Sequence, residues 1–247
     1  MQSDSNSPYH IASTNNDSNS GKFLIPRSQR RRFFIQFTLM TVLGWIVGGI
    51  ASIAIEKIIL ESLAVTAAQQ SPIFVTLVRF LSNIIFAVVF AADQALVLYR
   101  YLSGWLWILA TSLGWLIANT VSTAWIGYIS SVALSLNQTL SPEATIIFGL
   151  LSTIAYIFSG IWLGICQWLV LRRYTADVWW WNFLPSISFF FISVLIGLLS
   201  LVQDLIPEAN RTWIGQGFAA VMLGIIPAIS LCTLQKAGRQ RAGNNTN

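Results

Sequence analysis

Six long apolar runs constrain the fold of this chain more than any other feature of its sequence. Each run holds about 20 residues with few charges, which is the length that a helix needs to cross the hydrocarbon core of a bilayer. We therefore predict an all-α membrane protein with about six transmembrane helices. The predicted spans are Phe33–Ile55, Phe80–Leu98, Trp105–Ser130, Ala144–Leu171, Phe183–Val202 and Trp213–Leu234.

The composition also indicates that lipid is the main solvent of the chain. Of its 247 residues, 55% are hydrophobic and only 9% are charged, whereas soluble domains carry about 25% charged residues. The formal net charge is +5, but the basic residues lie at the ends of apolar runs rather than along one stretch. That placement is typical of a topology signal. The expected partner is the lipid bilayer, and no nucleic acid is expected.

The chain divides into four regions by composition. Residues 1–22 are rich in Ser and Asn and nearly free of apolar side chains, so we expect a disordered tail. Residues 23–32 form a basic juxtamembrane segment, and residues 33–235 form the six-helix transmembrane domain. Residues 236–247 form a second polar tail, and no soluble domain is expected outside the membrane.

The placement of Lys and Arg predicts the orientation. If the N-terminus is cytoplasmic, 11 of the 14 basic residues fall on the cytoplasmic side, and only Lys57, Arg79 and Arg211 fall on or near the other side. Such a bias indicates that both termini are cytoplasmic. The expected location is the inner, plasma or thylakoid membrane of a bacterium.

Tryptophans near the predicted span ends agree with this topology. Their rings can lie against acyl chains while the indole N–H reaches the headgroups. We interpret seven of them as interface anchors, six at the inner interface and Trp213 at the outer one. The six are Trp105, Trp107, Trp168, Trp179, Trp180 and Trp181.

Three tandem helical hairpins of one repeated type are predicted, covering residues 33–101, 105–174 and 183–235. Thr41-Val-Leu-Gly-Trp45 matches Thr111-Ser-Leu-Gly-Trp115, and each of these glycines precedes a Ser-Pro pair whose proline is 28 positions later. Ser-Pro before an apolar run indicates a helix start, with Pro at the first helical position. Each hairpin crosses twice, so the three copies share one orientation.

The third copy is shorter on the outer side. Gly197 precedes Pro207 by only 10 positions. The 18-residue difference corresponds to about 27 Å of helix, so the first four helices are predicted to project further than the last two.

Small residues spaced four apart predict close helix packing. They are Gly44 and Gly48, Gly114 and Ala118, and Gly160 and Gly164.

A second pattern joins the first two hairpins. Gln94-Ala-Leu-Val-Leu-Tyr-Arg-Tyr101 matches Gln167-Trp-Leu-Val-Leu-Arg-Arg-Tyr174, and each is followed by an aligned tryptophan, Trp107 or Trp180. The pattern resembles hairpins in uncharacterised polytopic membrane proteins of cyanobacteria and some other bacteria. The resemblance covers residues 163–181 well and 91–107 in part. It implies a bacterial, cyanobacterial-type origin and no particular activity.

Asp93 is the most informative charged residue, because it lies about two turns inside the second predicted span. A carboxylate at that depth is costly unless it is paired or hydrated. We expect an arginine partner, and the alternatives are a proton or ion relay and a protonated, silent side chain. Gln94 and Gln167 could bond across helices or contact a polar ligand. The candidate intramembrane polar cluster is Asp93, Gln94, Gln167, Arg100, Arg172 and Arg173.

Residues for catalysis are missing from the predicted spans. The one histidine is His10, in the N-terminal tail. This excludes a Ser–His or Cys–His pair, a histidine-ligated haem and an HExxH zinc site within the membrane. Cys166 and Cys232 lie inside apolar runs, where a buried structural thiol is expected. We expect no enzyme activity and no histidine-ligated metal.

Three functions remain compatible with the sequence. Few intramembrane charges and small-residue faces favour a non-catalytic accessory, assembly or scaffold subunit that packs against other membrane subunits. The alternative is a small transporter or channel with a polar path near Asp93, Gln94 and Gln167. A pigment-associated protein is the third, and its chlorophyll would need an amide, water or backbone ligand.

Overall fold

A computed structural model describes residues 23–62, 72–135, 142–176, 178–202 and 205–237. Both polar tails lie wholly or largely outside this part of the chain. Within it the fold is all-helical, with six helices that are long and apolar enough to span a membrane. They are α1 (Arg30–Ser62), α2 (Pro72–Leu98), α3 (Gly104–Ser135), α4 (Pro142–Leu171), α5 (Leu184–Leu201) and α6 (Glu208–Thr233). Two short 3-10 helices, η1 (Arg27–Gln29) and η3 (Trp179–Phe183), precede α1 and α5.

Each of the six predicted spans corresponds to one helix, and the main differences are extensions. The helix α1 runs to Ser62 rather than Ile55, because a helix can continue once it has left the hydrocarbon core. There Lys57 and Glu61 form an exposed ion pair one turn apart, with 3.7 Å between Nζ and Oε1. The helices α2 and α4 begin at Pro72 and Pro142, the first positions that the Ser-Pro pairs predict. Proline suits this position because its missing N–H would have no helical partner.

The six helices form a closed ring. Each helix packs against the next one in the chain, and α6 returns to pack against α1. Small residues allow several of these approaches. A Cβ added at Gly114 of α3 would lie 2.9 Å from the Leu163 Cα of α4, and one added at Gly224 of α6 would lie 3.1 Å from the Thr38 Cα of α1.

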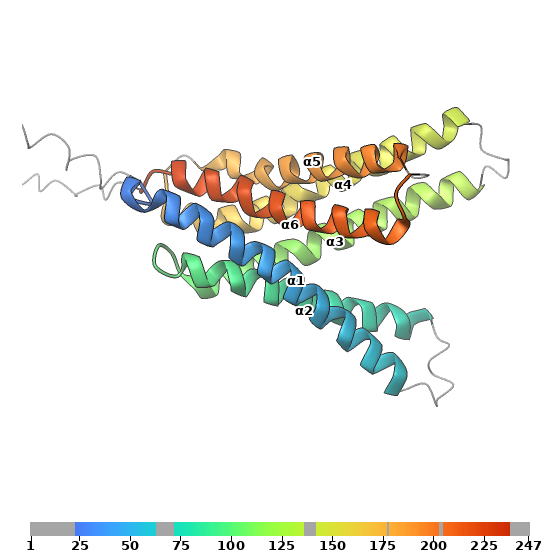
Figure 1. Ribbon diagram of the computed structural model, residues 1–247, viewed down its shortest axis with the longest axis horizontal. Helices are drawn as coiled ribbons and strands as arrows, with labels where there is room; N and C mark the ends of the chain where they lie inside the picture. Colours follow the sequence, from blue (N-terminus) through green and yellow to red (C-terminus); the bar gives the residue numbers. More distant parts are fainter. Residues whose placement is uncertain (1–22, 63–71, 136–141, 177, 203–204, 238–247) are drawn as a thin grey trace, which may run out of the picture.

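Both described ends of the chain lie at the same end of the bundle, here called the termini end (Figure 1). The Leu24 N–H donates to the Leu234 carbonyl at 2.8 Å, and the Ala237 N–H donates to the Tyr174 carbonyl at 3.0 Å. Leu24 and the adjacent Ile25 are buried. The segment predicted as juxtamembrane thus begins inside the core, because it pairs with the residues that follow α6.

The opposite end, here called the distal end, is uneven. The helix α5 has 18 residues and α3 has 32, which correspond to about 27 Å and 48 Å of helix. Figure 1 shows the α3–α4 hairpin extending beyond the distal ends of α5 and α6. The greater reach that the sequence predicts for the first four helices is therefore seen clearly for α3 and α4. Figure 1 also shows the distal half of the α1–α2 hairpin diverging from the other four helices.

Candidate functional site

The interior of the ring has three levels. At the termini end, large side chains such as Trp107, Trp181 and Phe37 are completely buried and fill the space. Midway along the bundle lies a second cluster of mainly aromatic side chains. Beyond it, toward the distal end, lies a pocket of about 580 Å³, a size within the usual range of ligand sites.

Two glutamine–tryptophan hydrogen bonds hold the termini level together. The indole Nε1 of Trp107 donates to Gln94 Oε1 at 3.2 Å, and that of Trp181 donates to Gln167 Oε1 at 3.0 Å. The Gln167 amide also donates from Nε2 to Thr111 Oγ1 at 3.2 Å, which joins α4 to α3. All five side chains are buried. These amides are therefore used for bonds between elements of the bundle.

The structure differs from the sequence interpretation at two of the tryptophans. Trp107 and Trp181 have no exposed surface, so they cannot reach headgroups as interface anchors. In addition, Trp181 bonds Gln167 in the same way that Trp107 bonds Gln94. The sequence alignment instead pairs Trp107 with Trp180. The reason is the 3-10 turn of η3, which directs Trp181 into the core and leaves Trp180 half-buried. Trp105, Trp179 and Trp213 are largely exposed, and Trp168 is half-buried.

Asp93 faces the α1–α2 contact. A Cβ added at Gly44 would lie 2.9 Å from Asp93 Oδ2. In the α3–α4 hairpin, a Cβ added at Gly114 would lie 3.0 Å from the Cys166 Cβ. The acidic residue and the cysteine thus occupy matching places in the two hairpins. Among the described residues, no hydrogen bond or ion pair reaches the Asp93 carboxylate.

The arginines of the candidate polar cluster do not join Asp93. The Arg100 Nε donates to the Tyr99 hydroxyl at 3.0 Å, and the Arg172 guanidinium lies 5.0 Å from the centre of the Trp168 ring. Arg173 is exposed at the termini end. The six residues are therefore spread over separate contacts in the described structure.

Five of the six small residues with four-residue spacing lie against a neighbouring helix or helix start. A Cβ at Gly48 would lie 3.2 Å from the Phe86 carbonyl oxygen, and one at Gly160 would lie 2.8 Å from the Ser186 nitrogen. At Gly164 it would collide with the Asn182 carbonyl. Ala118 is buried beside the distal pocket.

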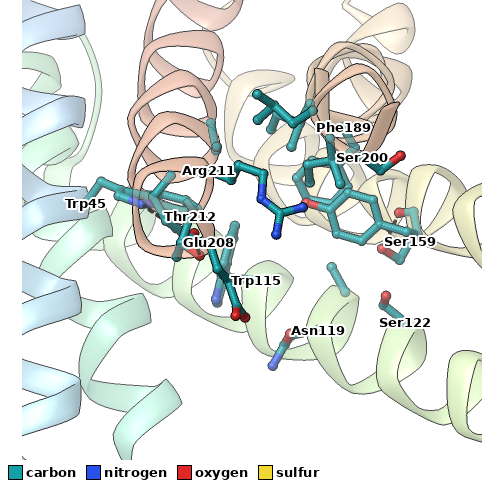
Figure 2. A pocket seen from close by; sticks show the side chains of 18 residues that line it. Trp45, Trp115, Asn119, Ser122, Ser159, Phe189, Ser200, Glu208, Arg211 and Thr212 are labelled. Carbon is teal, nitrogen blue, oxygen red and sulfur yellow. Dashed lines mark hydrogen bonds between the residues drawn. The ribbon is translucent and has the colours of Figure 1, made fainter. Parts of the chain in front are cut away.

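The distal pocket is lined by residues of every helix except α2. Polar groups from α3, α4 and α6 face it, among them Asn119, Ser122, Ser159 and Gln216. Figure 2 shows the Arg211 side chain reaching from α6 into the space, which the side chains of Asn119 and Glu208 also face. These residues lie on helices that the sequence predicts to be spans, but nothing in their spacing indicates that they would meet.

Arg211 is the most unusual group in this pocket. Its Nε is buried and has no hydrogen-bond partner in the described structure. No ion pair joins it to Glu208, which lies one turn earlier in α6 and is exposed. Leaving a buried charged donor unpaired is costly, more so than for a neutral group. Arg211 was expected only to mark the outer side of the membrane.

An aromatic layer, here called the plug, separates the pocket from the termini level. Trp45 and Trp115 meet edge to face with ring centres 5.6 Å apart, and Phe86 and Phe90 pack against both. Each indole N–H has a partner: Trp45 donates to Gln216 Oε1 at 3.1 Å and Trp115 to Asn83 Oδ1 at 3.2 Å. The plug thus lies between the pocket and the termini level of the ring.

Neither metal-ligand geometry nor similarity to known proteins adds a further assignment. In the described ranges, no group of three His, Cys, Asp or Glu side chains could hold a metal ion. The chain matches no protein-family model, no curated protein and no solved structure. The bacterial origin implied by the sequence resemblance remains a prediction, and function has to be inferred from the site.

Proposed function

We propose that this chain is a non-catalytic membrane protein of the small-transporter type, which binds an anionic solute in the distal pocket. One observation carries the proposal: the buried Nε of Arg211, which has no partner among the described residues, belongs to a side chain that lines a pocket of about 580 Å³. A planar guanidinium binds carboxylate or phosphate groups through two parallel hydrogen bonds. A bound anion would supply the partner that Arg211 lacks.

Glu208 limits the charge of the solute. Its carboxylate lines the same pocket as Arg211 and would repel an anion with several charges. It would attract an ammonium group. We therefore expect the pocket to favour a zwitterion with one anionic and one cationic group, such as an amino acid, over a dianion such as sulfate.

Because the plug lies between this pocket and the termini level, we expect no open path through the ring in the described arrangement. Transport would require Trp45, Trp115 and their neighbours to move, as in a carrier that alternates between two states, rather than a permanently open channel. The earlier expectation of a path along Asp93, Gln94 and Gln167 is less favoured, because both amides already bond inside the bundle.

Thermal unfolding of the purified protein in mild detergent tests the proposal. Glycine, glutamate, acetate, phosphate and sulfate are added separately at matched ionic strength. At a hundredfold excess over Kd, a ligand stabilises the folded state by ~2.7 kcal/mol, which raises Tm by about 5–10 °C in a chain of this size. We expect at least one amino acid to raise the Tm of the wild type.

The matched variants are Arg211→Met and Lys57→Met. Both remove one cation on the distal side, but Lys57 lies outside the pocket and is exposed. The ligand-induced shift is expected to disappear in Arg211→Met and to persist in Lys57→Met. An equal shift in both variants would contradict an anion site at Arg211, and no shift with any of the five solutes in the wild type would contradict a site of this class.

The repeat and the orientation belong to the same proposal. We infer three parallel hairpin repeats with both termini in the cytoplasm of a bacterium. Support comes from matching contacts, Gly44 with Asp93 and Gly114 with Cys166, and from the two glutamine–tryptophan bonds. The pocket would then open away from the cytoplasm.

An accessory or scaffold subunit is the second candidate, and the projecting α3–α4 hairpin favours it. Its distal part exposes large apolar side chains, including Trp125, Leu134 and Ile146. A partner subunit could cover this surface where it extends past α5 and α6. Co-purification in mild detergent tests this: the partner should be lost with Trp125→Asn plus Leu134→Asn. Unchanged co-purification would contradict docking at this hairpin.

A further inference from the structure

A second cavity lies at the termini end, on the α1–α2 hairpin. It has a volume of about 460 Å³ and separates the beginning of α1 from the end of α2. We call it the arginine groove, because Arg32 of α1 and Arg100, in the turn that follows α2, line it. Leu39, Met40 and Leu96 line its deeper part. The groove is thus charged at the membrane boundary and apolar toward the hydrocarbon core.

Neither arginine is paired with an anionic group in the described structure. Arg32 makes no ion pair or side-chain hydrogen bond with any described residue, and no acidic residue lines the groove. The Arg100 Nε is held by the Tyr99 hydroxyl at 3.0 Å. That bond raises the pKa of Arg100 and leaves the guanidinium beside the groove with its terminal nitrogens available. A single anionic group between the two arginines would satisfy both.

The wall of the groove is fixed by a hydrogen bond between the N-terminal segment and the α2–α3 connection. The Tyr101 hydroxyl donates to Gln29 Oε1 at 2.9 Å, and the Tyr101 ring packs edge to face against Phe33. Burial raises the pKa of Tyr101, so its phenol stays protonated near neutral pH and keeps donating. The groove is therefore formed before any ligand arrives.

The apolar residues in the deeper part of the groove favour a lipid over a soluble anion as its ligand. Leu39 lies seven residues deeper in α1 than Arg32, which is about 10 Å along the helix, and both Leu39 and Leu96 are largely exposed on the outside of the bundle. A phosphate held by the arginines would place its attached acyl chains along these leucines. From this charge and apolar complementarity we propose that the arginine groove binds one anionic phospholipid, with the phosphate between Arg32 and Arg100. Basic pockets between transmembrane helices commonly bind such headgroups.

Native mass spectrometry of the full chain tests this proposal. The protein is delipidated in detergent and mixed with equal amounts of phosphatidylglycerol and phosphatidylcholine that carry the same acyl chains. We expect the wild type to retain one phosphatidylglycerol in preference to phosphatidylcholine. The double variant Arg32→Gln/Arg100→Gln should lose this preference, by about fivefold for each arginine, the factor that corresponds to ~1 kcal/mol per basic residue near an anionic surface.

The matched control is Arg172→Gln/Arg173→Gln. It removes the same charge from the same end of the bundle, but neither residue lines the groove. Its preference for phosphatidylglycerol should equal that of the wild type. Equal loss in both double variants would overturn the proposal in favour of general surface charge, and equal retention of the two lipids by the wild type would overturn it outright. The Tm of each variant checks folding, because all four arginines are exposed.

Discussion

The indole Nε1 of Trp181 donates a 3.0 Å hydrogen bond to Oε1 of Gln167, and both side chains are buried at the termini level of the ring. The same residue types make the same bond between Trp107 and Gln94 at 3.2 Å. A hydrogen bond between helices is worth about 0.6–2 kcal/mol in a membrane. These bonds connect each of the first two hairpins to the element that follows it.

Replacing either glutamine by leucine leaves a buried indole N–H unpaired. We expect Gln167→Leu to lower the free energy of unfolding by about 1–2 kcal/mol, and Gln94→Leu to lower it less, since Gln167 also bonds Thr111. Unfolding in detergent mixtures measures both. Gln36→Leu is the control, because Gln36 is exposed. If all three variants unfold alike, the buried bonds contribute nothing measurable.

Glycines at helix contacts should tolerate no methyl group. Gly164→Ala drives a Cβ into the Asn182 carbonyl, and overpacking of this kind costs about 1–3 kcal/mol. Gly127 of α3 has nothing within 4 Å of an added Cβ. Gly127→Ala should therefore be neutral or slightly stabilising. The measurement is the Tm of the two variants. An unchanged Tm for Gly164→Ala would mean that α4 and η3 approach less closely than described.

Gly44 and Asp93 should be energetically coupled. Gly44→Ala would press on the Asp93 carboxylate, so its cost should fall in an Asp93→Ala background. We expect a coupling of about 0.5–3 kcal/mol from a double-mutant cycle. Additive effects of the two substitutions would argue against the contact.

Asp93→Asn separates the structural and transport roles of this residue. Since no described residue pairs with the carboxylate and a charge at this depth is costly, the substitution should leave the free energy of unfolding unchanged or raise it. A transport role would instead show as lost solute flux in vesicles with unchanged folding, because Asn cannot exchange a proton. A large loss of stability would reveal a partner for Asp93.

Arg211→Met should stabilise the ligand-free protein. The substitution removes a buried N–H donor that has no partner in the part of the chain that the structure describes, and such a group costs about 1–3 kcal/mol. Binding sites often reduce stability in this way. The measurement is the Tm without added solute, compared with Lys57→Met. A Tm for Arg211→Met below those of the wild type and Lys57→Met would indicate that Arg211 supports the fold.

Reporter fusions test the orientation. Fusions at residue 1 and residue 247 should both report the cytoplasm, and a fusion at Gln138 should report the opposite side. The reason is the excess of basic residues on one side of the spans. A cytoplasmic signal from Gln138 would contradict the six-span orientation.

Much of the helical framework could be predicted because each span depends on its own residues. In lipid, a backbone must satisfy its hydrogen bonds within one helix, so a long apolar run specifies a helix without help from the rest of the chain. Pro72 and Pro142 start their helices for an equally local reason. The short α5 and the uneven distal end follow from the spacing of such starts.

The pocket and the burial of particular side chains were decided by tertiary structure. Trp180 and Trp181 are neighbours of the same type, and only the turn of η3 determines which one reaches Gln167. Arg211, Asn119 and Ser159 belong to three helices, and no sequence spacing relates them. They meet because six helices close into a ring, and the rotation of each helix about its axis is set by contacts with its neighbours rather than by its own sequence.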